Sequence, residues 1–288
     1  MRIVLLNNKG GVGKTMIAGG IAEDAARRGR RVLLVDMDPQ ANTTDRFGVR
    51  PEIASGRVDE LHSLTRCLAP GVRNGDAGDY LYSCQWREEW AELIQVLPAD
   101  LDLEDRAIEA GLPGAANRLR KALAGVDDDH DITIIDCAPS LKGHLTGMSL
   151  AALNGDADAV VVPLAAERYA ITGALRSTAY VRATRDDFGV PHLDVAGLVV
   201  NSVRSGTNTH KVRYEQLVDQ FAGLTGGPVR VLGDRIPLRA RVAELQDLAR
   251  PMLDDRDLGA NPAGDPTGVV ASIRTITDAL LAREAVAA

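Results

Sequence analysis

The sequence predicts a doubly wound α/β fold, a mostly parallel sheet flanked by helices on both faces. Short runs rich in Val, Ile and Leu alternate with helical stretches along the chain, which is typical of parallel strands joined by crossover helices. The chain is 45% hydrophobic but only 3% aromatic, so the core is aliphatic. Since no linker or repeat interrupts the alternation, we expect residues 1–288 to form one domain.

The first apolar run, residues 3–6, leads into a glycine-rich turn and then into a helix expected to end near Gly29. Glycines let the backbone curve around an anion, so that N–H groups and the helix dipole point at it. A strand, such a turn and a helix N-terminus together predict a phosphate-binding P-loop. Its expected nucleotide contacts are Lys9, Gly10, Gly11, Val12, Gly13, Lys14, Thr15 and Met16.

Two side chains of this turn have predicted chemical roles. Lys14 supplies a positive charge over the β- and γ-phosphates, and the Thr15 hydroxyl helps to hold Mg²⁺. The strict P-loop spacing requires glycine at position 8, where this chain has Asn8, and a second lysine, Lys9, begins the loop. Two of the five lysines therefore flank the turn, which suits a phosphate cradle because lysine is a compact point charge.

The second predicted strand, residues 31–36, ends in Asp36 and is followed by a polar loop that contains Asp38. Ligands of doubly wound sheets bind beyond the carboxyl ends of the strands, so both carboxylates arrive beside the phosphates. There they could orient the waters of magnesium or an attacking water. The alternative is that Asp36 only caps a turn or helix.

A third strand, residues 131–136, ends in Asp136. An apolar strand that ends in aspartate is the Walker B arrangement, in which the carboxylate holds magnesium through water. The motif is weak alone, but the P-loop upstream makes it specific. The predicted metal-site residues are Thr15, Asp36 and Asp136.

The remaining elements are predicted from periodicity and turn residues. We expect strands at 93–97, 158–163 and 195–200, and helices at 104–124 (interrupted near 111–114), 166–186, 208–222 and 267–288. Trp86 and Trp90, four residues apart, are expected to form one packed helical face. The last helix is expected to bury Val269, Val270, Ile273, Ile276 and Leu280.

Composition excludes several classes of protein. The net charge of −7 argues against a wholly basic nucleic-acid binder but allows a local basic patch. The three cysteines form no CxxC pair, which indicates a reducing compartment. No apolar stretch is long enough to span a bilayer, and the chain enters a strand without a signal peptide. We therefore expect a cytoplasmic protein.

Five segments together resemble the ParA/MinD family of deviant Walker ATPases, and most closely its ParA branch. They are KGGVGKT, VDMDPQANTT, DITIIDCAPSL, VVVPLAAERYAITGAL and IPLRARVAELQDLARPM, and the match runs from residue 2 to about 252. The resemblance implies a P-loop NTPase with a deviant Walker A motif that uses ATP and Mg²⁺.

The resemblance also implies a role for each matching residue. Lys9 would be the signature lysine that reaches the nucleotide of a second subunit. Lys14 matches the lysine that binds the phosphates, and Thr15 matches the magnesium ligand. Asp136 matches the Walker B aspartate. Asp38 matches the aspartate that is needed for hydrolysis, and Asp36 would support the metal. Asn201 and Pro237 lie where relatives contact adenine.

The implied function is that of a partition ATPase. ATP would lie between two subunits, the dimer would bind DNA non-specifically on the nucleoid, and a ParB-type partner would stimulate slow hydrolysis to segregate or position DNA or other cargo. Residues 201–250 carry eight basic and five acidic side chains, in a chain that is acidic overall. The candidate DNA contacts are Arg204, Lys211, Arg213, Arg239 and Arg241. The alternative is a solvated basic face without a ligand.

Three rival functions remain open. A MinD-like membrane-associated ATPase requires a basic amphipathic C-terminal helix, whereas residues 267–288 carry only Arg274 and Arg283. A nitrogenase-reductase-like electron carrier requires cysteines that Cys137 alone does not supply. A metabolic P-loop ligase or kinase would not need Lys9.

The chain departs from the family pattern after the Walker B strand, where Lys142 is one extra residue. In relatives this segment senses the γ-phosphate, so the hydrolysis rate is expected to be atypical.

Overall fold

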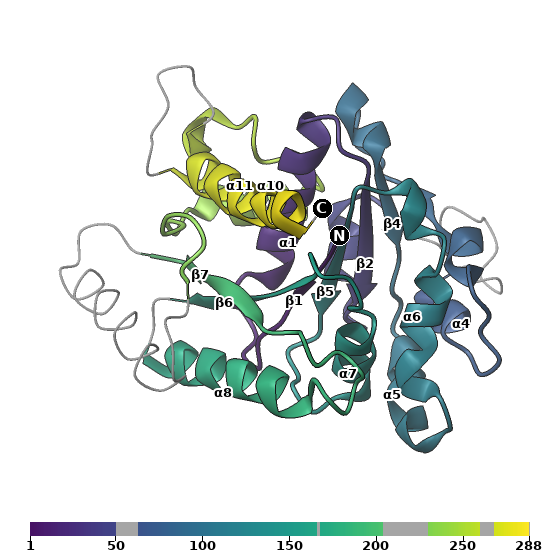
Figure 1. The fold of residues 1–288 in the computed structure, drawn as a ribbon. Coiled ribbons are helices and arrows are strands. Elements are labelled where there is room, and N and C mark those ends of the chain that lie inside the picture. Colours follow the sequence, from purple (N-terminus) through teal and green to yellow (C-terminus); the bar gives the residue numbers. More distant parts are fainter. Residues whose placement is uncertain (50–62, 166–167, 204–229, 260–267, 288) are drawn as a thin grey trace.

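A computed structural model describes residues 1–49, 63–165, 168–203, 230–259 and 268–287. Its centre is a seven-stranded sheet with the strand order β3-β4-β2-β5-β1-β6-β7 (Figure 1). The strands are β1 (Arg2–Leu5), β2 (Val32–Met37), β3 (Tyr82–Ser83), β4 (Ile94–Leu97), β5 (Ile132–Cys137), β6 (Ala159–Ala165) and β7 (Val195–Asn201). All neighbours pair in parallel except β3, which is antiparallel to β4. The predicted mostly parallel sheet is confirmed.

Helices cover both faces of this sheet, as a doubly wound fold requires (Figure 1). One layer contains α1 (Lys14–Arg27), α10 (Ala240–Asp247) and α11 (Val269–Ala287). The other contains α4 (Leu64–Cys67), α5 (Leu103–Ile108), α6 (Arg118–Leu123), α7 (His144–Ala151) and α8 (Arg168–Thr184). A short helix, α2 (Asn42–Arg46), follows the polar loop after β2. Among the described helices, none has both the length and the hydropathy to cross a bilayer.

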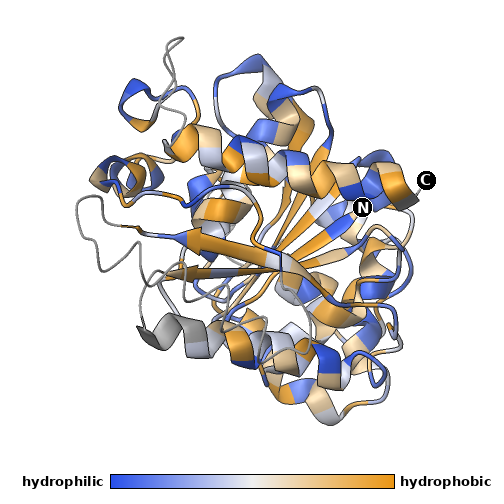
Figure 2. Cartoon of the chain, turned by 60° about the vertical axis from the view of Figure 1, so that its left-hand side comes forward, coloured by the Kyte–Doolittle hydropathy of each residue, from blue (hydrophilic) through white to orange (hydrophobic). Residues whose placement is uncertain are grey.

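The core consists of two aliphatic clusters, one on each face of the sheet. Every residue of β1, β2, β5 and β6 is buried, because these strands are covered by helices on both sides. Figure 2 shows the apolar strands lying between helices whose outer surfaces are polar. The predicted apolar face of the last helix is confirmed, since Val269, Val270, Ile273, Ile276 and Leu280 of α11 are each at most 1% exposed.

The middle of the chain differs in detail from the prediction. The expected interruption near 111–114 is confirmed: α5 and α6 are separate helices, with Gly114 between them at φ 73°. The two tryptophans do pack together, with 5.8 Å between ring centroids, but the prediction that they lie on one helix is wrong. Trp90 lies in a 3₁₀ turn, η2 (Glu89–Leu93), whereas Trp86 precedes it and stacks on Phe47 with 4.5 Å between ring centroids. The expected helix at 208–222 lies outside the described residues.

Candidate nucleotide site

The glycine-rich turn after β1 has the backbone geometry of an anion cradle. Gly11 and Gly13 adopt φ values of +72° and +89°, which side chains with a Cβ rarely tolerate. Gly13 is the N-cap of α1, and no side chain caps the first turn of that helix. The N–H groups at this helix N-terminus are therefore available to a phosphate.

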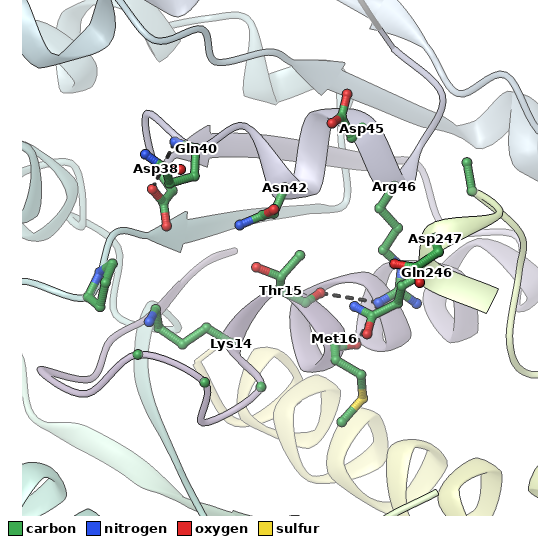
Figure 3. A pocket seen from close by; sticks show the side chains of 15 residues that line it. Lys14, Thr15, Met16, Asp38, Gln40, Asn42, Asp45, Arg46, Gln246 and Asp247 are labelled. Carbon is green, nitrogen blue, oxygen red and sulfur yellow. Dashed lines mark hydrogen bonds between the residues drawn. The ribbon is translucent and has the colours of Figure 1, made fainter. Parts of the chain in front are cut away.

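A cavity of about 760 Å³ opens beside this turn (Figure 3). From the predicted set it is lined by Gly10, Gly11, Gly13, Lys14, Thr15, Met16 and Asp38. The other lining residues are Gln40, Asn42, Asp45, Arg46, Pro139, Gln246, Asp247 and Ala249. Residues from four separate parts of the chain therefore surround one space next to the P-loop.

Asp136, at the end of β5, lies directly behind Thr15. Its Oδ2 accepts hydrogen bonds from the hydroxyls of Thr15 and Thr43, each at 2.7 Å. The carboxylate is 1% exposed, and its Oδ1 has no hydrogen-bond partner within the described structure. A buried carboxylate oxygen without a partner is costly, so this oxygen indicates a missing ligand. One free carboxylate oxygen and a hydroxyl beside a phosphate cradle fit Mg²⁺, which takes few protein ligands and keeps several waters.

Asp36 occupies the position opposite Asp136 on the neighbouring strand β2, and it is fully buried. One of its oxygens accepts from the amide and hydroxyl of Thr44, both at 2.8 Å, and the other accepts from the amide of Asp38 at 3.2 Å. Burial and the nearby Asp136 raise the pKa of Asp36 to about 8. Asp36 therefore holds the loop and the start of α2, and its support of the metal stays a prediction.

Asp38 differs from Asp36 because it lines the cavity. Its side chain is half-buried, and its Oδ1 accepts a hydrogen bond from the amide of Gln40 at 3.0 Å. This turn keeps the carboxylate at the mouth of the site. The polar loop after β2 therefore contributes one carboxylate to the cavity and keeps the other, that of Asp36, inside the fold.

Comparison with known proteins identifies the family. A family model described as an AAA domain matches residues 1–190. The chromosome-partitioning ATPase Soj of Thermus thermophilus is 34% identical over 243 residues, covering 84% of this chain and 83% of its own. The chromosome partitioning protein ParA of Myxococcus xanthus is 31% identical over 252 residues, covering 87% and 80%. This chain belongs to the ParA/Soj family of partition ATPases.

A solved structure with the same fold also holds a ligand. Cobyrinic acid a,c-diamide synthase from Mycobacterium smegmatis, crystallised with ADP and magnesium, superposes with a TM-score of 0.68 at 28% identity. The match covers 90% of this chain and 96% of that one. The ParA/Soj chain described here thus has the architecture of a protein known to bind a magnesium nucleotide.

Four predicted nucleotide contacts of this ParA/Soj chain are not among the residues that line the cavity: Lys9, Val12, Asn201 and Pro237. The side-chain amide of Asn201, 6% exposed, donates to the carbonyl of Val12 at 3.0 Å and so braces the P-loop from behind. Pro237 bridges to Val203 beside β7. The Lys9 side chain is half-buried, and its amide donates to Oδ1 of Asn7 at 2.9 Å. Adenine recognition by Asn201 and Pro237, and a contact across a dimer by Lys9, stay predictions.

Sequence reasoning missed the side chains of α2. Thr43 and Thr44 hold the two strand-end aspartates, and Arg46 reaches the first turn of α1. The Arg46 guanidinium is buried and donates to the carbonyls of Thr15 and Met16 at 3.3 and 3.2 Å. Burial lowers the pKa of Arg46 to about 10, so it keeps its charge at neutral pH. The sequence did contain one indication that these residues belong to the site, because they follow directly after the loop that contains Asp38.

Gly19 of α1 makes room for this arginine, and that gives a stability prediction. A Cβ at position 19 would lie 2.6 Å from Cζ of Arg46, which two backbone carbonyls hold in place. We expect Gly19→Ala to destabilise the fold by about 1–3 kcal/mol, although alanine is the better helix former. Urea unfolding measures the difference.

The double variant Gly19→Ala/Arg46→Ala provides the control for that prediction. With the guanidinium gone, alanine at 19 should no longer be penalised, so the two changes should show a coupling energy. If Gly19→Ala costs the same with and without Arg46, this contact is not the cause.

The candidate DNA contacts are only partly described. Arg204, Lys211 and Arg213 lie outside the described residues. Arg241 forms ion pairs with Asp255 at 2.9 Å and Glu244 at 3.0 Å, whereas Arg239 is half-buried and has no ion pair among the described residues. Residues 230–259 contain six arginines and six acidic residues, so this part of the expected basic patch is neutral.

Proposed function

We propose that this ParA/Soj family protein binds ATP with Mg²⁺ in the cavity beside the P-loop and hydrolyses it slowly. The observation that carries the proposal is the convergence of the glycine cradle, Lys14 and Thr15 with the unpartnered oxygen of Asp136. Lys14 would neutralise the phosphates, and Thr15 with Asp136 would hold magnesium, which supplies charge stabilisation when bound. Asp38, at the mouth of the cavity, would orient the attacking water.

We further propose that ATP joins two copies of the chain. Lys9 begins the P-loop, and in the proposed dimer it contacts the nucleotide of the second subunit. If both subunits touch the γ-phosphate, ATP favours the dimer and hydrolysis removes that link. A slow ATPase then acts as a timer for any activity that requires the dimer.

The dimer-dependent activity that we propose is non-specific DNA binding on the nucleoid, with hydrolysis stimulated by a ParB-type partner on the cargo. Dimerisation doubles the number of phosphate contacts, so affinity for DNA should rise steeply and depend on salt. Support comes from the named relatives, which are chromosome-partitioning proteins. The alternative, a MinD-like membrane cycle, is disfavoured because the apolar face of α11 is buried against the core.

Light scattering with and without ATP and Mg²⁺ tests the proposal. We expect a monomer without nucleotide and a dimer with a non-hydrolysable ATP analogue. The dimer, and not the monomer, should be retained on DNA of arbitrary sequence at low salt. A protein that binds the analogue tightly and stays monomeric would contradict the dimer, while the nucleotide site would stand.

The charge pattern around α10 predicts which arginine variant reports on DNA. Arg239→Glu should weaken DNA binding and lower the slope of log affinity against log salt by about 1, because one phosphate contact is lost. It should not reduce stability, since Arg239 has no ion pair within the described part of the chain. Arg241→Glu should also reduce stability, since it places a third acid beside Asp255 and Glu244. Filter binding at several salt concentrations, with thermal melting of each variant, separates the two effects. If Arg239→Glu binds DNA with the wild-type slope, Arg239 makes no phosphate contact.

A further inference from the structure

The Asp136 carboxylate is held by two hydroxyls from two different helices. Thr15 begins α1, and Thr43 lies in the first turn of α2, yet both hydroxyls donate to the same oxygen, Oδ2. Two donors on one oxygen restrict rotation of the carboxylate about its Cβ–Cγ bond. Oδ1 is thereby left buried and without a hydrogen-bond partner among the described residues, in a carboxylate bonded to Thr15, which itself lines the cavity.

Thr43 uses its hydroxyl differently from two equally buried threonines of the long helices α8 and α11. Thr178 of α8 and Thr277 of α11 are fully buried, and each hydroxyl donates to the carbonyl four residues earlier in its own helix. That bond is the common outcome for threonine inside a helix. Thr43 is equally buried, but its hydroxyl crosses to β5. Its hydrogen bond therefore serves the aspartate and not the local helix.

The segment before Thr43 connects it to the cavity. Ala41, the N-cap of α2, has φ +55°, and its amide donates to the carbonyl of Asp38 at 2.9 Å. This tight turn joins the cavity-lining loop to α2. Within α2, the next residue, Thr44, donates its amide and its hydroxyl to Asp36 and so attaches the helix to β2. The turn before α2 and the bonds of Thr44 thus fix the backbone at Thr43, so its hydroxyl is a rigidly placed donor.

We propose that Thr43 is a positioning residue of the magnesium site, which sets the orientation of the Asp136 carboxylate and leaves Oδ1 for the water shell of the metal. This inference rests on the proposed function, because the metal belongs to the nucleotide site. Thr15 can ligate the metal through its oxygen while it donates its proton to Asp136, and Thr43 supplies the second donor. Groups that orient a metal-binding carboxylate typically contribute about 10- to 100-fold to metal affinity.

Metal affinity without turnover tests this role. Mn²⁺ replaces Mg²⁺ as the probe, and electron paramagnetic resonance measures free Mn²⁺ during titration of the protein saturated with ADP. We expect Thr43→Val, which keeps the shape and removes the hydroxyl, to weaken Mn²⁺ binding about tenfold or more. Thr43→Ser keeps a hydroxyl and should restore most of the affinity. ADP binding measured in EDTA should be unchanged in both variants.

Thr178→Val is the matched control, because it makes the same change at an equally buried threonine in α8. It should leave Mn²⁺ affinity at the wild-type value. Thermal melting checks that each variant folds, and Thr43→Ala replaces Thr43→Val if the latter does not fold. Wild-type Mn²⁺ affinity in a folded variant without the hydroxyl, or equal losses in Thr43→Ser and Thr43→Val, would overturn the inference. A wild-type protein that binds no ADP would instead overturn the proposed function.

Discussion

Lys14→Ala is expected to lower kcat/KM for ATP by about 10²- to 10³-fold, the usual loss when a preorganised charge is removed from a transition state. The Lys14 side chain is only 7% exposed and lies in the first turn of α1, beside the glycine loop (Figure 3). Arg46 is the other basic residue among the described ones that lines the cavity, but its guanidinium donates to the carbonyls of Thr15 and Met16, so we do not expect it to replace the charge of Lys14. Steady-state phosphate release with saturating Mg²⁺ measures the effect.

Lys121→Ala is the control for this experiment. Lys121 is an exposed lysine of α6, on the opposite layer of the fold, and its removal should leave the ATPase rate unchanged. Binding of a fluorescent ATP analogue shows whether the Lys14 variant loses nucleotide affinity as well as rate. Hydrolysis by Lys14→Ala at the wild-type rate would mean that ATP is turned over elsewhere.

The sequence was sufficient to predict that Lys14, Thr15 and Asp136 lie close together, because each stands at a fixed point of the fold. Lys14 and Thr15 begin a helix after a glycine turn, and Asp136 ends a parallel strand next to that turn. The carboxyl ends of parallel strands share one edge, so residues about 120 positions apart were expected to meet. The 2.7 Å hydrogen bond between Thr15 and Asp136 shows that they do.

The supporting residues were not predictable in the same way. Thr43, Thr44 and Arg46 lie in a five-residue helix, too short for hydrophobic periodicity to assign a face to each residue. The sequence placed both Asp36 and Asp38 beside the phosphates, whereas the structure buries Asp36 against Thr44 and leaves only Asp38 lining the cavity. Arg241 was predicted as a DNA contact, although Glu244, three residues along the same helix, is a local ion-pair partner that the sequence could have indicated. Its second partner, Asp255, is 14 positions away and has no local pattern.

Because Asp38 lines the cavity and Asp36 is buried, the second large effect is expected from a change at Asp38. Asp38→Ala should slow ATP hydrolysis by about 10²- to 10⁴-fold, the range for loss of a group that activates water. The P-loop and Asp136 are untouched by this change, so ATP should still bind. Because hydrolysis is what ends the proposed dimer, the variant should accumulate as an ATP-bound dimer, which size-exclusion chromatography with light scattering detects.

Asp38→Asn separates chemistry from structure. Asparagine can still accept the hydrogen bond from the Gln40 amide, so the turn at the mouth of the cavity is kept while the negative charge is removed. If the carboxylate orients water, Asn and Ala should be equally slow and both should hold the dimer. If Asp38 only shapes the loop, Asp38→Asn should hydrolyse ATP at close to the wild-type rate and return to monomer. Rapid turnover in both variants would assign the water-orienting role to another residue of the cavity.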